Sequence, residues 1–250
     1  MLNGFIVTVA DFAQAGGGVS LTFGLSPFQL VTVFAATMLL FRSGPELPRN
    51  RFFEPLAVAL ALVPSSAVAW AGLLIYSLSL MRGVRGERCA GLLLIAGLAL
   101  ASLWSAVGMN ALSVPITSFE TAIVAKVLSI VEPSVEQTGN VIGLAGGFKL
   151  VVLPACTSAT ILPNAMLALT ALVALFQGKF DATFLKVAGL VAVLLTIGND
   201  IRLAAMSLSG EHYALIHGPV GANLFDLFQT ALIVGAAYGL IDEGGMAEHA

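Results

Sequence analysis

Residues 184–207 read FLKVAGLVAVLLTIGNDIRLAAMS, an almost unbroken apolar run with one short polar segment near its end. A helix needs about 20 apolar residues to cross a hydrocarbon core ~30 Å thick, so this run predicts a membrane span. Arg202 lies inside it, and an ionisable side chain within a span is costly enough to indicate a function. The alternatives are a side chain that extends to the membrane surface or one that pairs with Asp200.

The whole chain has the same apolar character as this run. Of its 250 residues, 58% are hydrophobic and 10% are charged, and the mean hydropathy is +0.97. Soluble proteins carry about 25% charged residues. The net charge of −3 and the lack of a long basic run argue against a nucleic-acid partner. We therefore predict one integral membrane domain over residues 1–250, in contact with the lipid bilayer and without a cofactor or metal.

The remaining apolar runs predict an all-α bundle of transmembrane helices. The clear spans are 26–41, 89–110, 157–177, 184–207 and 219–241. Residues 52–81 fit either one long helix or a helical hairpin that turns at Pro64. Clusters of arginines lie on both sides of this segment, and cytoplasmic loops are enriched in Lys and Arg, so the hairpin is favoured. The expected count is about seven helices, with six or eight as alternatives.

Residues 111–155 are expected to form an extracytoplasmic excursion. Thr117 and Glu120 have the spacing of a capping box, which predicts the start of an external amphipathic helix that ends near Pro133. Apolar runs on either side of Gly146-Gly147 predict a short β-hairpin within 139–152. This hairpin delivers the chain to Cys156.

Cys156 and His217 are the candidate nucleophile and general base. Cys156 lies at the expected start of a helix, a position that favours the thiolate. A lone cysteine is more often a small buried hydrophobic residue, and Cys89 is assigned to that class. His217 lies in or beside the last external loop, before Gly218-Pro219 at the start of the last helix, where an imidazole can serve a thiol nucleophile. His212, in the same loop, is expected to be solvated.

Helix lengths predict that Cys156, Arg202 and His217 share one membrane edge. Counted from the turn at 178–181, Cys156 and Arg202 differ in depth by about three residues, or roughly 4.5 Å at 1.5 Å per residue. His217 follows across a short loop. Such a trio suits acyl transfer, because the thiolate attacks a carbonyl, the imidazole moves the proton and the guanidinium stabilises the oxyanion.

Three short motifs, taken in chain order, resemble those of the exosortase/archaeosortase family. They are Ala155-Cys156-Thr157-Ser158, Asn199-Asp200-Ile201-Arg202 and His217-Gly218-Pro219-Val220-Gly221. The resemblance covers 139–221, the expected catalytic core, and departs from the family's Ala-Cys-Ser-Gly pattern after the cysteine. It implies Cys156, Arg202 and His217 as catalytic residues. It also implies supporting roles for Asn199, Thr157 and Gly221.

The resemblance further implies a substrate and a location. The expected substrates are exported proteins with a C-terminal motif, a transmembrane segment and a basic tail, cleaved by a thiol protease or transpeptidase of the inner (plasma) membrane. The active site would face the extracytoplasmic side. Competing hypotheses are a small transporter or channel subunit that uses Asn199, Asp200 and Arg202, and a structural subunit. A further alternative is a zinc site built from Cys156, His212 and His217.

Overall fold

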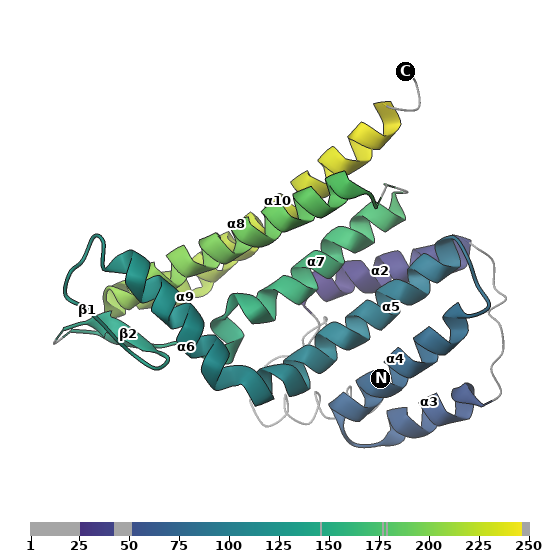
Figure 1. Cartoon of the computed structure of the whole chain (residues 1–250), viewed down its shortest axis with the longest axis horizontal. Helices are drawn as coiled ribbons and strands as arrows, with labels where there is room; N and C mark the ends of the chain where they lie inside the picture. Colours follow the sequence, from purple (N-terminus) through teal and green to yellow (C-terminus); the bar gives the residue numbers. More distant parts are fainter. Residues whose placement is uncertain (1–25, 43–51, 146, 177, 179, 247–250) are drawn as a thin grey trace. The chain divides into compact units, whose positions relative to one another are not determined.

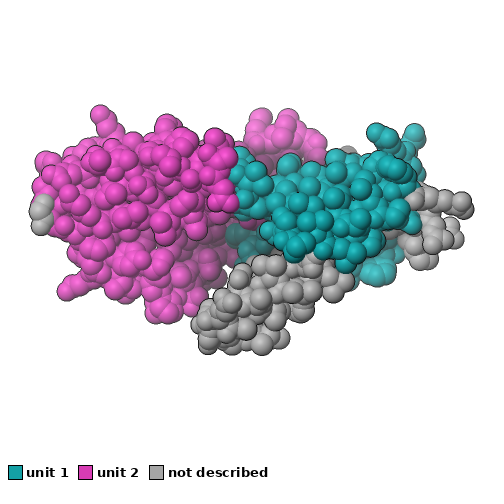
Figure 2. All heavy atoms as spheres, turned by 90° about the horizontal axis from the view of Figure 1, so that it is seen from below, with its two compact units in different colours: residues 1–108, 167–179, 241–250 teal, residues 109–166, 180–240 magenta. Residues whose placement is uncertain are grey.

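The computed structural model describes residues 26–42, 52–145, 147–176, 178 and 180–246, and most of them are helical (Figure 1). The chain divides into two compact units, each considered by itself (Figure 2). Unit 1 comprises residues 1–108, 167–179 and 241–250, and unit 2 comprises 109–166 and 180–240.

Four helical stretches of the described residues are long and apolar enough to cross a membrane. They are Glu87–Leu128, Ser158–Leu175, Ala182–Ser207 and Pro219–Asp242. Three shorter apolar helices precede them: α2 (Pro27–Arg42), α3 (Phe53–Leu62) and α4 (Ser66–Met81). The predicted class, an all-α membrane protein, agrees with this content.

Unit 1 is a row of packed helices in the order α2, α5 (Glu87–Leu103), α4, α3 (Figure 1). The segment 52–81 is two helices rather than one, because Val63, which precedes Pro64, is extended at φ −67° and ψ 131°. The two helices pack tightly, since a Cβ built on Gly72 would lie 2.8 Å from the Leu60 Cβ. The Arg42 guanidinium donates to the Leu175 carbonyl at 2.9 Å, so the ends of α2 and α7 (Ser158–Leu175) meet.

The predicted separate helix starting at Thr117 is wrong. Helix α5 continues through a π-helical turn, Trp104–Gly108, into α6 (Met109–Leu128) without an end near Asn110. The Thr117 hydroxyl donates back to the Ser113 carbonyl at 2.7 Å, so Thr117 is an interior residue of a helix rather than a cap. Thr117 and Glu120 are both buried.

A three-stranded antiparallel sheet follows α6. Strands β1 (Val135–Thr138), β2 (Val141–Leu144) and β3 (Lys149–Val151) pair in the order β1-β2-β3. Strands β2 and β3 lie where the sequence predicts a β-hairpin, and β1 is an additional strand. Gly143 of β2 is paired with Lys149 of β3, and a Cβ on Gly143 would collide with the Phe148 carbonyl oxygen.

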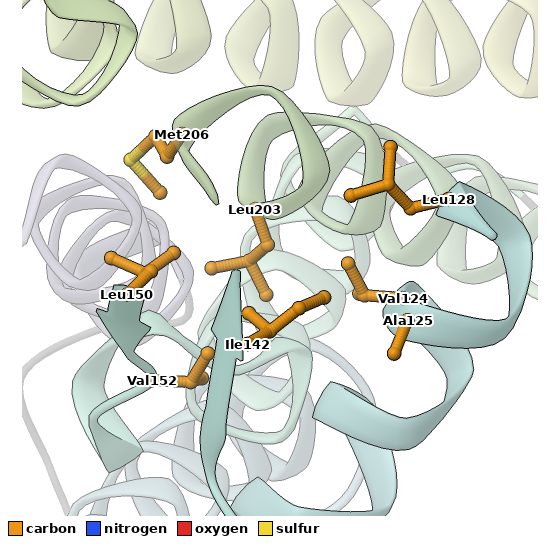
Figure 3. Packing of buried hydrophobic residues seen from close by; sticks show 8 residues of the cluster. All are labelled: Val124, Ala125, Leu128, Ile142, Leu150, Val152, Leu203 and Met206. Carbon is orange, nitrogen blue, oxygen red and sulfur yellow. The ribbon is translucent and has the colours of Figure 1, made fainter. Parts of the chain in front are cut away.

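The core of unit 2 lies between α6, the sheet and α8 (Ala182–Ser207), as Figure 3 shows. Its buried members are Val124, Ala125, Leu128, Ile142, Leu150, Val152, Leu203 and Met206. Cys156, Tyr213 and Ile216 are partly buried against the same cluster. The sheet is thus fixed to α6 and α8, and it holds the segment that leads to Cys156.

The predicted external loop around His212 contains a short helix, α9 (Gly210–His217). Ser209 caps it by accepting a hydrogen bond from the His212 backbone N–H at 3.1 Å. His217 is therefore the last residue of a helix, not a loop residue. The final helix, α10 (Pro219–Met246), begins two residues later.

Candidate functional site

Cys156 ends a tight 3₁₀ turn, Pro154–Cys156, directly before α7. Its backbone N–H donates to the Leu153 carbonyl at 2.9 Å, and the N–H of Thr157 donates to the Pro154 carbonyl at 3.2 Å. The hydroxyls of Thr157 and Thr160 also donate to the Pro154 carbonyl, each at 2.8 Å. The turn is held by four hydrogen bonds, and Cys156 itself is half-buried.

Asn199 joins the Cys156 turn to α8. The side chain is fully buried, and its Nδ2 donates to the Cys156 carbonyl at 2.9 Å and to Glu120 Oε1 at 2.9 Å. These two bonds use both N–H groups of the amide. The cysteine motif and the Asn-x-x-Arg motif, 43 residues apart, are therefore in direct contact.

Glu120 is a member of this network that sequence analysis missed. Its Oε1 accepts from the Ser158 backbone N–H at 2.9 Å and from the Ser158 hydroxyl at 2.8 Å, besides Asn199. The carboxylate thus lies at the N-terminus of α7, where a helix favours negative charge. The available signal in the sequence is an acidic residue within an apolar stretch. The capping-box spacing instead indicates a local role for this residue.

Arg202 follows Asn199 by three residues and turns toward α10. Its Cζ lies 4.8 Å from the centroid of the Phe225 ring, a cation–π geometry. Its buried Nε has no hydrogen-bond partner among the described residues, and the same holds for Oδ1 of Asp200. In that part of the chain no ion pair joins Asp200 to Arg202. Asp200 instead interacts with Glu120.

His217 is exposed and stacks on Tyr213, with ring centroids 4.9 Å apart and an interplanar angle of 15°. Tyr213 packs on the unit 2 core and against the Phe148 ring. Gly221 allows α10 to begin against the end of α9, because a Cβ there would collide with the Ile216 backbone. His212 has a local role, its Nδ1 lying 2.7 Å from the Ser209 hydroxyl.

The structure brings some of the predicted residues together and leaves others apart. Asn199 and Thr157 contact the Cys156 turn directly. Among the described residues, no hydrogen bond joins the thiol of Cys156, the guanidinium of Arg202 and the imidazole of His217. The same part of the chain holds no group of three His, Cys, Asp or Glu side chains that could bind a metal ion, so the zinc alternative has no ligand cluster.

The fold and the site together define an all-α membrane protein with a buried polar network beside a half-buried cysteine. Comparison with protein-family models, with curated proteins and with solved structures found no match to this chain. The features of this chain that bear on its function are therefore the geometry of unit 2 and the three motifs.

Proposed function

We propose that this chain is a membrane cysteine peptidase or transpeptidase of the exosortase/archaeosortase kind. Its substrates would be exported proteins with a C-terminal motif, a transmembrane segment and a basic tail. The observation that carries the proposal is the hydrogen bond from Asn199 to the Cys156 carbonyl. It joins two of the three motifs, which the sequence shows only as separate short patterns.

The proposed reaction begins at the thiolate of Cys156. The sulfur attacks the scissile carbonyl carbon, and the resulting tetrahedral intermediate expels the amine, which takes a proton from the His217 imidazolium. The N-terminal part of the substrate is then held as a thioester. Water or an acceptor amine attacks this thioester and gives up a proton to the imidazole. The thiolate leaves, and the starting pair of thiolate and imidazolium is restored.

The hydrogen bonds of the turn favour a side-chain donor for the oxyanion. The backbone N–H groups of Cys156, Thr157 and Ser158 already donate to the Leu153 carbonyl, the Pro154 carbonyl and Glu120. They are thus not free to bind a developing oxyanion, which needs donors aimed at it. The Nε of Arg202 has no hydrogen-bond partner among the described residues, and Arg202 lies one helical turn from Asn199. It therefore suits this role once its side chain moves away from Phe225.

His217 suits the acid–base role because its surroundings hold the ring while leaving it exposed. Tyr213 stacks beneath the imidazole, and both Tyr213 and Cys156 border the unit 2 core. Gly221 supports this arrangement by letting α10 start close to Ile216. Substrate binding would then need to bring the imidazole and the thiol to opposite sides of one peptide bond.

The finer topology is part of the proposal. We infer about seven helices, with α3 and α4 as a hairpin that leaves both arginine clusters on the cytoplasmic side of the inner (plasma) membrane. The Arg42–Leu175 bond supports this inference, since it joins two helix ends that the topology assigns to that side. The Cys156 turn, at the other end of α7, would then face the extracytoplasmic side.

The test is processing of a co-expressed substrate with the C-terminal motif, helix and basic tail. Cys156→Ala and Cys156→Ser are expected to abolish cleavage while the protein still inserts, because no other thiol lies beside the network. Cys89→Ala is the matched control and is expected to process normally. Arg202→Ala and His217→Ala should also block processing. Normal cleavage by Cys156→Ala would end the peptidase proposal.

A transporter or channel subunit is the second candidate. The observation in its favour is a set of three buried polar atoms on α8 that have no hydrogen-bond partner among the described residues: Asn199 Oδ1, Asp200 Oδ1 and Arg202 Nε. Polar groups within a membrane helix often mark a substrate path. In that case Cys156→Ala would leave transport intact, whereas Arg202→Ala would impair it.

A further inference from the structure

The Glu120 carboxylate takes no part in the acyl-transfer steps, yet it is the centre of the polar network beside Cys156. We propose that Glu120 is a positioning residue, which fixes the Cys156 turn by holding the start of α7 and Asn199 to α6. The proposal rests on the proposed function only where it concerns processing. The positioning itself is a property of the fold that can be measured without a substrate.

The hydrogen bonds around Glu120 link three elements of unit 2. From α6, Oε1 accepts two bonds from Ser158 at the start of α7 and one from Asn199 of α8. Asn199 in turn donates to the Cys156 carbonyl. Ser158, two residues after Cys156, and Asn199, which binds the Cys156 carbonyl, are thus both held by the same oxygen atom.

Burial makes this link consequential. Glu120 is 7% exposed and Asn199 is 0% exposed. Water cannot replace a partner at such a site, so removal of the carboxylate leaves the Ser158 donors and one Asn199 N–H unsatisfied. The start of α7 then loses its tie to α6, and the turn that carries Cys156 is released with it.

The geometry assigns the role to hydrogen bonding rather than to charge. Oε1 accepts all three donors, whereas Oε2 shares the Ser158 N–H at 3.0 Å. A glutamine at this position keeps one oxygen for the three donors and loses the negative charge. The charged groups nearby on α8 are Asp200, which interacts with Glu120, and Arg202, which lies over Phe225.

The experiment compares Glu120→Ala with Glu120→Gln in a Cys89→Ala background, where Cys156 is the single thiol. Thr121→Val is the matched control, because Thr121 is adjacent on α6 and 0% exposed, and its hydroxyl donates to the Thr117 carbonyl of its own helix. Two rates are measured on native membranes. One is alkylation of Cys156 by a membrane-impermeant maleimide, and the other is substrate processing, resolved into kcat and KM.

In Glu120→Ala, alkylation is expected to accelerate roughly fivefold or more, since a released turn exposes the thiol more often. Processing kcat should fall by about tenfold or more with KM changed less than about twofold, the pattern of a misplaced reacting group. Glu120→Gln and Thr121→Val should stay within about threefold of the parent in both rates.

An alkylation rate in Glu120→Ala equal to that of the parent would overturn the proposal, and so would a glutamine variant that behaves like the alanine variant. Should Glu120→Ala fail to accumulate in membranes, the glutamine variant and Thr121→Val still decide between hydrogen bonding and charge. Failure of the proposed function is distinguishable, since it would appear as processing by Cys156→Ala, while alkylation of Cys156 would still be faster in Glu120→Ala than in the parent.

Discussion

At the residue scale, Asn199 joins two buried groups that lie far apart in the chain: it donates to the carbonyl of Cys156 and to the carboxylate of Glu120. Its place in an Asn-x-x-Arg motif could be predicted from the sequence. Its partner Glu120 could not, because the contact spans 79 residues and no local pattern encodes it. Local spacing instead favoured a capping role for Glu120, whereas in the structure Glu120 bonds to residues far away in the chain.

Asn199→Leu tests this convergence, because leucine has a similar volume but no donors. The Cys156 carbonyl loses this donor and Glu120 keeps only its Ser158 donors. A buried group that loses its partner costs about 1–3 kcal/mol, so the free energy of unfolding should fall by about that amount. Thermal melting of the purified protein in detergent measures the loss. The control is Thr196→Val on the same helix, which removes one local bond to the Ala192 carbonyl. Equal melting temperatures for the two variants would mean that the long-range bonds of Asn199 stabilise the protein no more than one local bond does.

At the element scale, the sheet links the core of unit 2 to the Cys156 turn. Ile142 and Leu150 of β2 and β3 are buried against α6 and α8 (Figure 3), and β3 ends five residues before Cys156. Helix positions could largely be predicted from apolar periodicity: α7 and α8 begin within two residues of the expected starts. The end of α5 could not, because a π-helical turn carries the chain through Asn110 without a break.

Gly143→Ala tests the sheet's role. The added methyl group would collide with the Phe148 carbonyl oxygen, so β2 and β3 must separate, at a cost of about 1–3 kcal/mol. The expected result is a lower melting temperature together with faster alkylation of Cys156. Gly189→Ala in α8 is the control, since nothing lies within 4 Å of its added Cβ. An unchanged alkylation rate in Gly143→Ala would mean that the sheet does not hold the Cys156 turn in place.

At the scale of the whole molecule, the continuous helical stretch Glu87–Leu128 is too long for one membrane crossing. Its 42 residues correspond to roughly 63 Å at 1.5 Å per residue, about twice the ~30 Å hydrocarbon core. The residues after it include the exposed polar strand residues Glu136, Gln137 and Thr138. We therefore expect the α6 end of this stretch to project into water.

Single cysteines placed at Ile130 and Leu93, in a chain lacking Cys89 and Cys156, test this expectation. Both native side chains are on the protein surface, with exposures of 80% and 51%. A membrane-impermeant thiol reagent added from outside should label Ile130→Cys and not Leu93→Cys, because lipid covers the middle of α5. Labelling of both positions at similar rates would mean that the stretch does not cross the membrane as inferred.

Unit 2 is formed from residues 109–166 and 180–240, so its two parts are synthesised one after the other. Glu120 and Cys156 leave the ribosome before Asn199 exists, and the interval from Glu120 is 79 residues. At ~5–20 residues per second, that delay amounts to roughly 4–16 s. During this interval the Glu120 carboxylate and the Cys156 carbonyl of the nascent chain lack the Asn199 amide as a donor, so the arrival of α8 is the event that completes the polar network.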